Sequence, residues 1–124
     1  MKRVQLINET HPLSEPFEAR YCNTFLCRLR GLMFTPSIDP QEGLLMVQTS
    51  QDRINAAIHM FFMNYDLAVI WLDRSLKVVD VQTARRWRPA YTPAHPALYV
   101  LEAHPDRAAD FHTGDQVILK TCAN

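Results

Sequence analysis

Glycine is scarce in this chain, with only three in 124 residues. Gly-rich loops that hold phosphate groups need several closely spaced glycines. No serine stands in a Gly-x-Ser-x-Gly elbow, the turn that exposes the nucleophile of many hydrolases. The sequence therefore predicts neither a phosphate-binding loop nor a serine nucleophile of that kind.

The chain also lacks an excess of charge and a long apolar run. Thirteen basic residues balance thirteen acidic ones, so no overall field attracts nucleic acid or an acidic membrane. The longest purely apolar run, Leu67–Leu72, is far shorter than the roughly 20 residues of a membrane helix. The first apolar stretch ends at Ile7, too early for a secretory signal peptide. We expect a cytoplasmic monomer whose partners are neither nucleic acid nor membrane.

Cysteine is limited to positions 22, 27 and 122, an odd number without a Cys-x-x-Cys pair. This pattern argues against a disulfide framework and indicates a reducing compartment, with pairing of Cys22 and Cys27 as a minor alternative. Cys27 falls on the apolar stripe of an expected helix and is interpreted as a small buried residue. Because paired Cys/His spacing is also missing, we predict no metal ion and no other cofactor.

What the sequence does contain is a series of short alternating segments. Alternating or continuously apolar patterns predict extended chain at 3–8, 17–21, 44–49, 55–63, 66–73, 77–83, 97–103 and 115–121. Helical spacing follows Asn23, an expected cap, and Pro105 opens a possible helical turn. Leu67–Leu72 is apolar on both faces, as a covered central strand requires. The prediction is a mainly β single domain over residues 1–124. It is a β-sandwich or partly open barrel of about seven or eight strands with one or two short helices.

Six short motifs occur in order along the chain: RLRGLMF at 28–34, GLL at 43–45, IHMFFM at 58–63, VIWLD at 69–73, VLE at 100–102 and GD at 114–115. Together, over about residues 20–119, they resemble the prokaryotic family called domain of unknown function 192, or uncharacterised protein family 0127. The resemblance implies a compact, mainly β domain, a bacterial source and a short helix carrying the Gly-Leu-Met element. It implies no activity. Relatives usually carry Pro-x-Asp before the apolar strand, where this chain has Asp66 and Ala68.

His59 interrupts an apolar segment and is the first candidate for a functional side chain. If 58–63 is extended, His59, Phe61 and Met63 share one face, and Asp66 is the nearest acid that could pair with the imidazole. Imidazoles change charge near neutral pH, which suits ligand binding or proton transfer. Two alternatives stay open: a structural ring bonded to a backbone carbonyl, and a ligand of a soft metal ion beside methionine thioethers.

Two further candidates lie later in the chain. Trp87 and Arg88 belong to an Arg-Arg-Trp-Arg cluster at 85–88, a composition found where anions or single-stranded nucleic acids bind and equally in solvated loops. The neutral net charge argues against nucleic acid. Glu102 follows Leu101 in an expected strand, and a regular strand would place its carboxyl group on an apolar face with Val100.

The first functional hypothesis is a non-enzymatic binding or accessory module. Its ligand, a small molecule or a protein, would contact a face formed by His59, Met63, Asp66, Trp87, Arg88 and Glu102. The alternative is a small hydrolase or isomerase that uses His59 with a carboxylate. An enzyme needs an acid–base pair or nucleophile that converges on one cleft, and the sequence shows no such spacing. No catalytic residue is therefore assigned.

Overall fold

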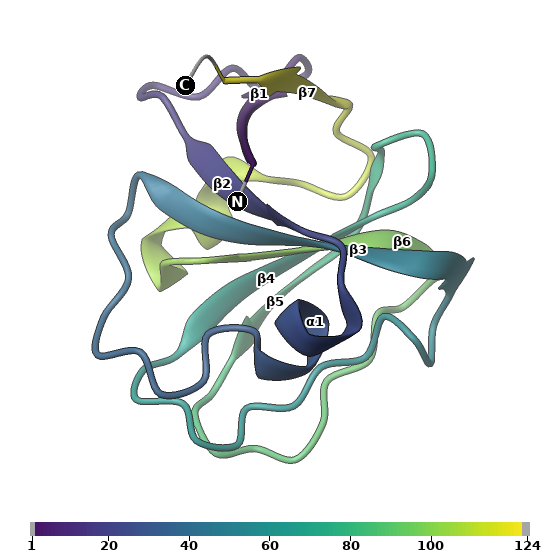
Figure 1. The fold of residues 1–124 in the computed structure, drawn as a ribbon. Coiled ribbons are helices and arrows are strands. Elements are labelled where there is room, and N and C mark those ends of the chain that lie inside the picture. The colour runs from purple at the N-terminus through teal and green to yellow at the C-terminus, as the bar shows by residue number, and fades with distance from the viewer. Residues whose placement is uncertain (1, 123–124) are drawn as a thin grey trace.

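The computed structural model describes residues 2–122. Over these residues the chain forms seven strands and two short helices (Figure 1). In chain order they are β1 (Arg3–Asn8), β2 (Glu18–Cys22), α1 (Phe25–Arg30), β3 (Glu42–Asp52), β4 (Leu67–Leu72), β5 (Val78–Ala84), β6 (Ala97–Ala103), the 3-10 helix η1 (Pro105–Asp110) and β7 (Val117–Thr121). No helix in the described chain is both long and apolar enough to cross a membrane.

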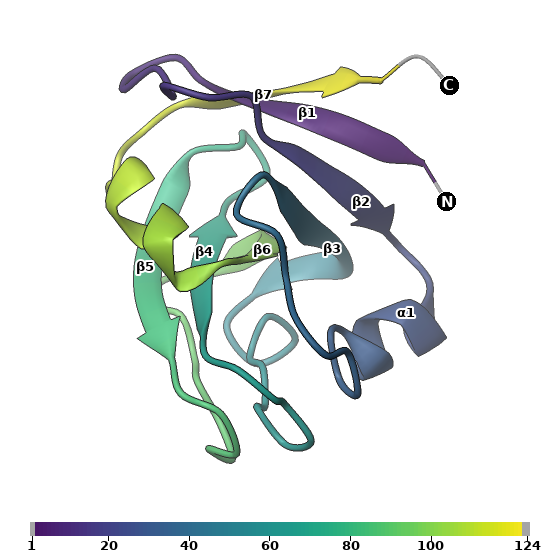
Figure 2. The ribbon, with the colours of Figure 1, turned by 90° about the vertical axis from the view of Figure 1, so that its left-hand side faces the viewer.

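The strands form one curled sheet in the order β5-β4-β6-β3-β2-β1-β7. Strands β2 and β3 are parallel, and the other neighbouring pairs are antiparallel. The two ends of the sheet approach each other, because Val78 N–H donates to the carbonyl of Asp115 (2.9 Å) and Val117 N–H to that of Leu76 (3.0 Å). Figure 2 shows β1, β2 and β7 turning away from the plane of β4 to β6. The prediction of a partly open barrel is confirmed.

The sheet is covered on both faces, so it has two apolar cores. Ile70 and Leu72 of β4 point into the curl with Leu101, whereas Val69 and Trp71 point to the outer face. Loops cover that outer face, and one of them accepts a hydrogen bond from Trp71 Nε1 at the carbonyl of Ala56 (2.7 Å). All six residues of β4 are buried. The prediction that Leu67–Leu72 is a central, doubly covered strand is confirmed.

The segment 58–63 is not a strand, contrary to the prediction. Only Ile58 forms a bridge, with Tyr91. Met60 instead exchanges backbone hydrogen bonds with the next loop: its N–H donates to the carbonyl of Arg88 (2.9 Å), and Trp87 N–H donates to its carbonyl (2.7 Å). The physical reason lies in the sheet, where β5 and β6 already occupy both edges of β4. The two loops therefore pair with each other on the outer face.

Helix α1 differs from the sequence prediction in its cap, and its apolar side is exposed. Thr24, rather than Asn23, is the N-cap, and its Oγ1 accepts a hydrogen bond from Cys27 N–H (3.2 Å). Phe25, Leu26 and Leu29 are the large apolar residues of the helix, and each is more than half exposed. A helix of six residues is too short to bury a whole apolar stripe, and Leu32, just beyond it, is the residue that enters the core.

Cys22 and Cys27 form a disulfide, with their Cα atoms 5.7 Å apart. The prediction of unpaired cysteines was wrong, and the interpretation of Cys27 as a small buried residue was wrong with it. The reason is local: Cys22 ends β2, and the first turn of α1 brings Cys27 back over that strand end. The argument for a reducing compartment rested on unpaired cysteines and loses its basis.

Candidate functional site

A cavity of about 390 Å³ opens between α1, β3 and the loop that follows β3. It extends from the helix down to the outer face of the sheet at β6. Its walls combine apolar side chains with a small number of polar ones. The polar and charged residues are Arg28, Arg30, Gln48, Thr49, Asn55, His59 and Glu102. This size and mixture are typical of sites that bind small molecules.

Glu102 supplies the carboxyl group of the cavity. It lies in the middle of the sheet, paired in register with Leu44 of β3 and Val69 of β4. Only 4% of the residue is exposed, and within the described chain its Oε1 has no hydrogen-bond partner. Burial raises the pKa of Glu102 from 4.5 to about 7. A buried carboxyl group without a partner destabilises the fold, so its presence calls for a functional explanation.

Gly31 lies directly against the carboxyl group of Glu102. It ends α1 with a φ of 51°, in the region that favours glycine, and its N–H donates to the carbonyl of Cys27 (2.9 Å). A β-carbon at Gly31 would lie 3.3 Å from Oε1 of Glu102. Glycine thus lets the helix end approach the carboxyl group closely. Gly31 was quoted only as part of a motif and was not predicted as a site residue.

Arg28 positions the helix and brings a positive charge to the cavity. Its Nη1 donates to the carbonyls of Asn23 (2.9 Å) and Val47 (3.2 Å), which ties α1 to β3. The RLRG motif thus supplies two elements of the site, a cation at Arg28 and a close backbone approach at Gly31. Their spacing within one motif was the sequence signal that could have identified both residues.

His59 lines the same cavity as Glu102 and Met63. The ring is half-buried, and its Nδ1 accepts a hydrogen bond from Phe61 N–H (3.2 Å). In the neutral ring the proton therefore resides on Nε2, leaving that nitrogen to act as a donor. The structure thus brings together three of the six residues predicted for a binding face.

The match to known proteins covers this whole arrangement. The family model DUF192, described as "Uncharacterized ACR", matches residues 6–119. The chain belongs to the DUF192 family. Among curated relatives, a UPF0127 protein of Thermococcus gammatolerans is 42% identical over 90% of this chain and 72% of its own length. Another, of Thermococcus kodakarensis, is 44% identical over 78% of this chain.

The DUF192 chain spans only 60% of the T. kodakarensis relative, which has further sequence outside the match. These relatives are archaeal, so a bacterial source is not confirmed, and they have no defined function. A protein of unknown function from Novosphingobium aromaticivorans has a TM-score of 0.79 at 22% identity, covering 94% of this chain and 83% of its own. A proposed transcription regulator from Sinorhizobium meliloti reaches 0.80 at 16%, covering 95% and 92%. At these identities the likeness concerns the fold alone.

The other three predicted residues of this DUF192 protein lie outside the residues that line the cavity. Asp66 does not pair with His59, because its carboxylate accepts hydrogen bonds from Arg86, at the backbone N–H (2.9 Å) and at Nε (3.1 Å). The backbone hydrogen bond from Arg86 is the main cause that lowers the pKa of Asp66. Arg88 is exposed in the neighbouring loop. The suggested His59–Asp66 pairing was wrong because 58–63 is a loop and has no regular alternation.

Trp87 belongs to a row of exposed aromatic rings beside the cavity loops. Its ring lies edge-on to Phe62 (centroids 5.3 Å apart), and Phe62 stacks on Phe34 (5.1 Å). All three residues have positive φ angles, between 61° and 66°, a conformation that is uncommon outside glycine. The predicted single face is therefore divided into a cavity at Glu102 and an aromatic row at Trp87. A partner at Trp87 stays a prediction.

Proposed function

We propose that this DUF192 protein binds a small molecule in the cavity over Glu102, through a polar group of the ligand that reaches the Glu102 carboxyl. The observation that supports the proposal is the buried, unpartnered Oε1 of Glu102 beneath a cavity of about 390 Å³. A ligand that hydrogen-bonds this group would remove the cost of leaving it unpaired. The balanced charge favours a small molecule over nucleic acid or a membrane surface.

The walls indicate what kind of ligand fits. Leu29, Met33, Ile58 and Met63 offer apolar surface to a hydrocarbon or ring. With its pKa raised to about 7, Glu102 donates a hydrogen bond to a carbonyl when protonated and pairs with an amine when ionised. The ligand is thus a small, partly apolar molecule with one such polar group. Arg28 and His59 Nε2 are then placed to contact its other polar atoms.

A matched series of compounds tests the proposal. Hexylamine, hexanamide and hexanoate share one apolar chain and differ only in the polar group. Thermal shift and isothermal titration calorimetry would compare the wild type with Glu102→Gln and with Glu9→Gln. The last changes an exposed carboxylate that does not line this cavity. We expect the amine to bind the wild type and the Glu9 control, and to lose at least tenfold in affinity for Glu102→Gln, which carries no negative charge. Equal binding to all three proteins, or to none of them, would contradict the proposal.

An acid–base enzyme is the second candidate, because His59 and Glu102 line one cavity. This convergence is what the hydrolase or isomerase hypothesis requires. Binding is favoured because His59 Nδ1 already accepts from Phe61 N–H, which leaves only Nε2 to exchange a proton with a ligand. Turnover of a bound ligand that is lost in His59→Ala while its affinity is retained would establish the enzyme instead.

A further inference from the structure

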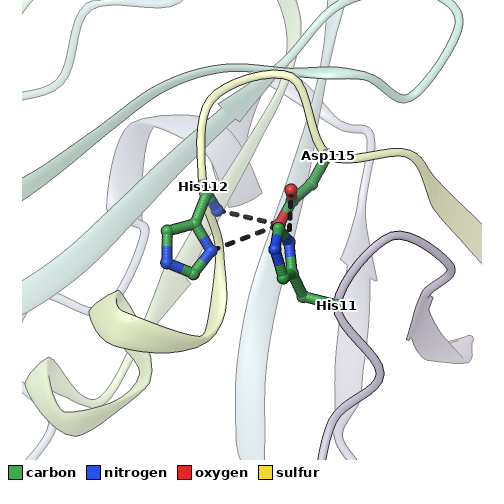
Figure 3. A group of neighbouring side chains, drawn as sticks. All are labelled: His11, His112 and Asp115. Atoms are coloured by element: carbon green, nitrogen blue, oxygen red, sulfur yellow. Dashed lines mark hydrogen bonds and ion pairs between the residues drawn. The ribbon is translucent and has the colours of Figure 1, made fainter.

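Three metal-ligating side chains meet away from the Glu102 cavity. His11 lies in the connection between β1 and β2, His112 follows η1, and Asp115 precedes β7. Figure 3 shows both imidazole rings facing the same carboxylate. Nδ1 of His11 lies 2.7 Å from Oδ1 of Asp115, and Nδ1 of His112 lies 3.6 Å from its Oδ2. The two ring centroids are 4.6 Å apart.

The carboxylate is fixed in place, and the two imidazoles are free to adjust. Asp115 is buried, and its Oδ2 accepts hydrogen bonds from Asn8 Nδ2 (2.8 Å) and from His112 N–H (2.9 Å). The side chains of His11 and His112 are 54% and 58% exposed. A rigid acid flanked by two adaptable imidazoles is a site in which small ring rotations complete a coordination sphere.

We propose that His11, His112 and Asp115 bind a zinc ion. One candidate ligand atom from each residue lies within 4.8 Å of the others. Zinc holds imidazole nitrogen and carboxylate oxygen at about 2.0–2.2 Å, so tetrahedral ligand atoms lie roughly 3.4 Å apart. The 3.6 Å separation at His112 already fits this spacing. Nδ1 of His11 is hydrogen-bonded to the other carboxylate oxygen, Oδ1, so this ring has to move away from the carboxylate to make room for the ion.

Zinc binding at Nδ1 of His11 requires the other tautomer of this ring. Before zinc binds, Nδ1–H of His11 donates to Asp115. When zinc binds, the lone pair of Nδ1 coordinates the ion and the ring proton moves through solvent to Nε2, so the imidazole stays neutral. The remaining coordination position faces water, because both histidines lie at the surface. The ion would connect the β1–β2 segment to the segment before β7, and would thereby hold these two segments together at one edge of the barrel.

Zinc chloride, titrated calorimetrically into the chelator-treated full chain, tests the proposal. The variants are His11→Ala, His112→Ala and the double variant, and His95→Ala serves as control because His95 is exposed and outside the cluster. We expect one equivalent to bind the wild type and the control. Each cluster variant should bind at least tenfold more weakly. Zinc should also raise the melting temperature of the wild type but not of the double variant.

Two results would overturn the proposal. One is wild-type protein that does not bind zinc at millimolar concentration. The other is a double variant that binds zinc as tightly as the wild type, which would place the ion elsewhere on the chain. Magnesium gives an independent comparison, since this hard cation prefers oxygen ligands. Equal affinity for magnesium would argue against imidazole coordination. Selective shifts of the His11 and His112 ring signals in NMR spectra would support it.

Discussion

Gly31 lies directly over the carboxyl group of Glu102, so that a β-carbon at Gly31 would be 3.3 Å from Oε1. The two residues are far apart in the sequence and belong to different motifs, RLRGLMF and VLE. The contact between them connects the end of α1 to the centre of the sheet. A glycine at this point keeps the cavity open above the carboxyl group.

Replacing Gly31 by alanine should destabilise the protein by roughly 1–3 kcal/mol, because alanine strongly disfavours this backbone conformation. Urea unfolding measures the change. Gly114→Ala is the matched control: Gly114 also has a positive φ, but nothing lies within 4 Å of its added β-carbon. Part of this cost comes from crowding of the new β-carbon against Glu102. Gly31→Ala should therefore be less destabilising in a Glu102→Ala background, where that carboxyl group is absent. If the unfolding free-energy changes of the two substitutions simply add, the contact between Gly31 and Glu102 does not affect stability.

Glu102 should make the protein less stable as the pH rises. Burial raises the pKa of its carboxyl group from 4.5 to about 7, so the folded state holds the proton more tightly than the unfolded chain. This stabilisation is complete below about pH 4.5 and is lost as the pH rises through about 7. At about 1.4 kcal/mol per pKa unit the loss amounts to roughly 3 kcal/mol.

Urea unfolding of the wild type and Glu102→Gln between pH 4.5 and 8 checks this expectation. Other groups titrate in both proteins, so the difference between the two curves isolates Glu102. The free energy of unfolding of the wild type should fall relative to that of the glutamine variant as the pH rises across this interval. Parallel curves would mean that Glu102 keeps an ordinary pKa.

The disulfide between Cys22 and Cys27 should stabilise the protein by about 2 kcal/mol, the value for closing a short loop in the unfolded chain. A reductant should lower the melting temperature of the wild type and of Cys122→Ser, which removes the free cysteine. It should leave a Cys22→Ser/Cys27→Ser variant unchanged. Counting thiols in the denatured, unreduced wild type should find one. Three free thiols would refute the pairing.

Truncation of Ile70 to alanine should cost roughly 2–5 kcal/mol, because this central side chain is fully buried inside the curl of the sheet. Ile118→Ala is the comparison, since Ile118 lies on edge strand β7 and is 39% exposed. It should cost less than about 1 kcal/mol. Chemical denaturation measures both, and similar costs at the two positions would argue against the assigned core.

The sequence by itself determined most of the strands and the family. Alternation and short apolar runs are local properties, so 67–72, 77–83 and 97–103 could be recognised as strands without knowledge of their neighbours. The six motifs between 28 and 115 together carried the family resemblance and, with it, a mainly β domain with a short helix. These predictions were confirmed because each depends on residues that are close in the sequence.

Only the tertiary structure decided which apolar segments form strands or are buried, and which distant residues come into contact. The apolar segment 58–63 became a loop because both edges of β4 were already paired, and the stripe of α1 stayed exposed because the helix is too short to bury it. The meeting of Gly31 with Glu102, and of His11 with His112, depends on how the sheet curls. Contacts between residues so distant in the chain leave no periodic signal. The proposed sites of this protein therefore depend on its tertiary structure, whereas its strands follow from local sequence.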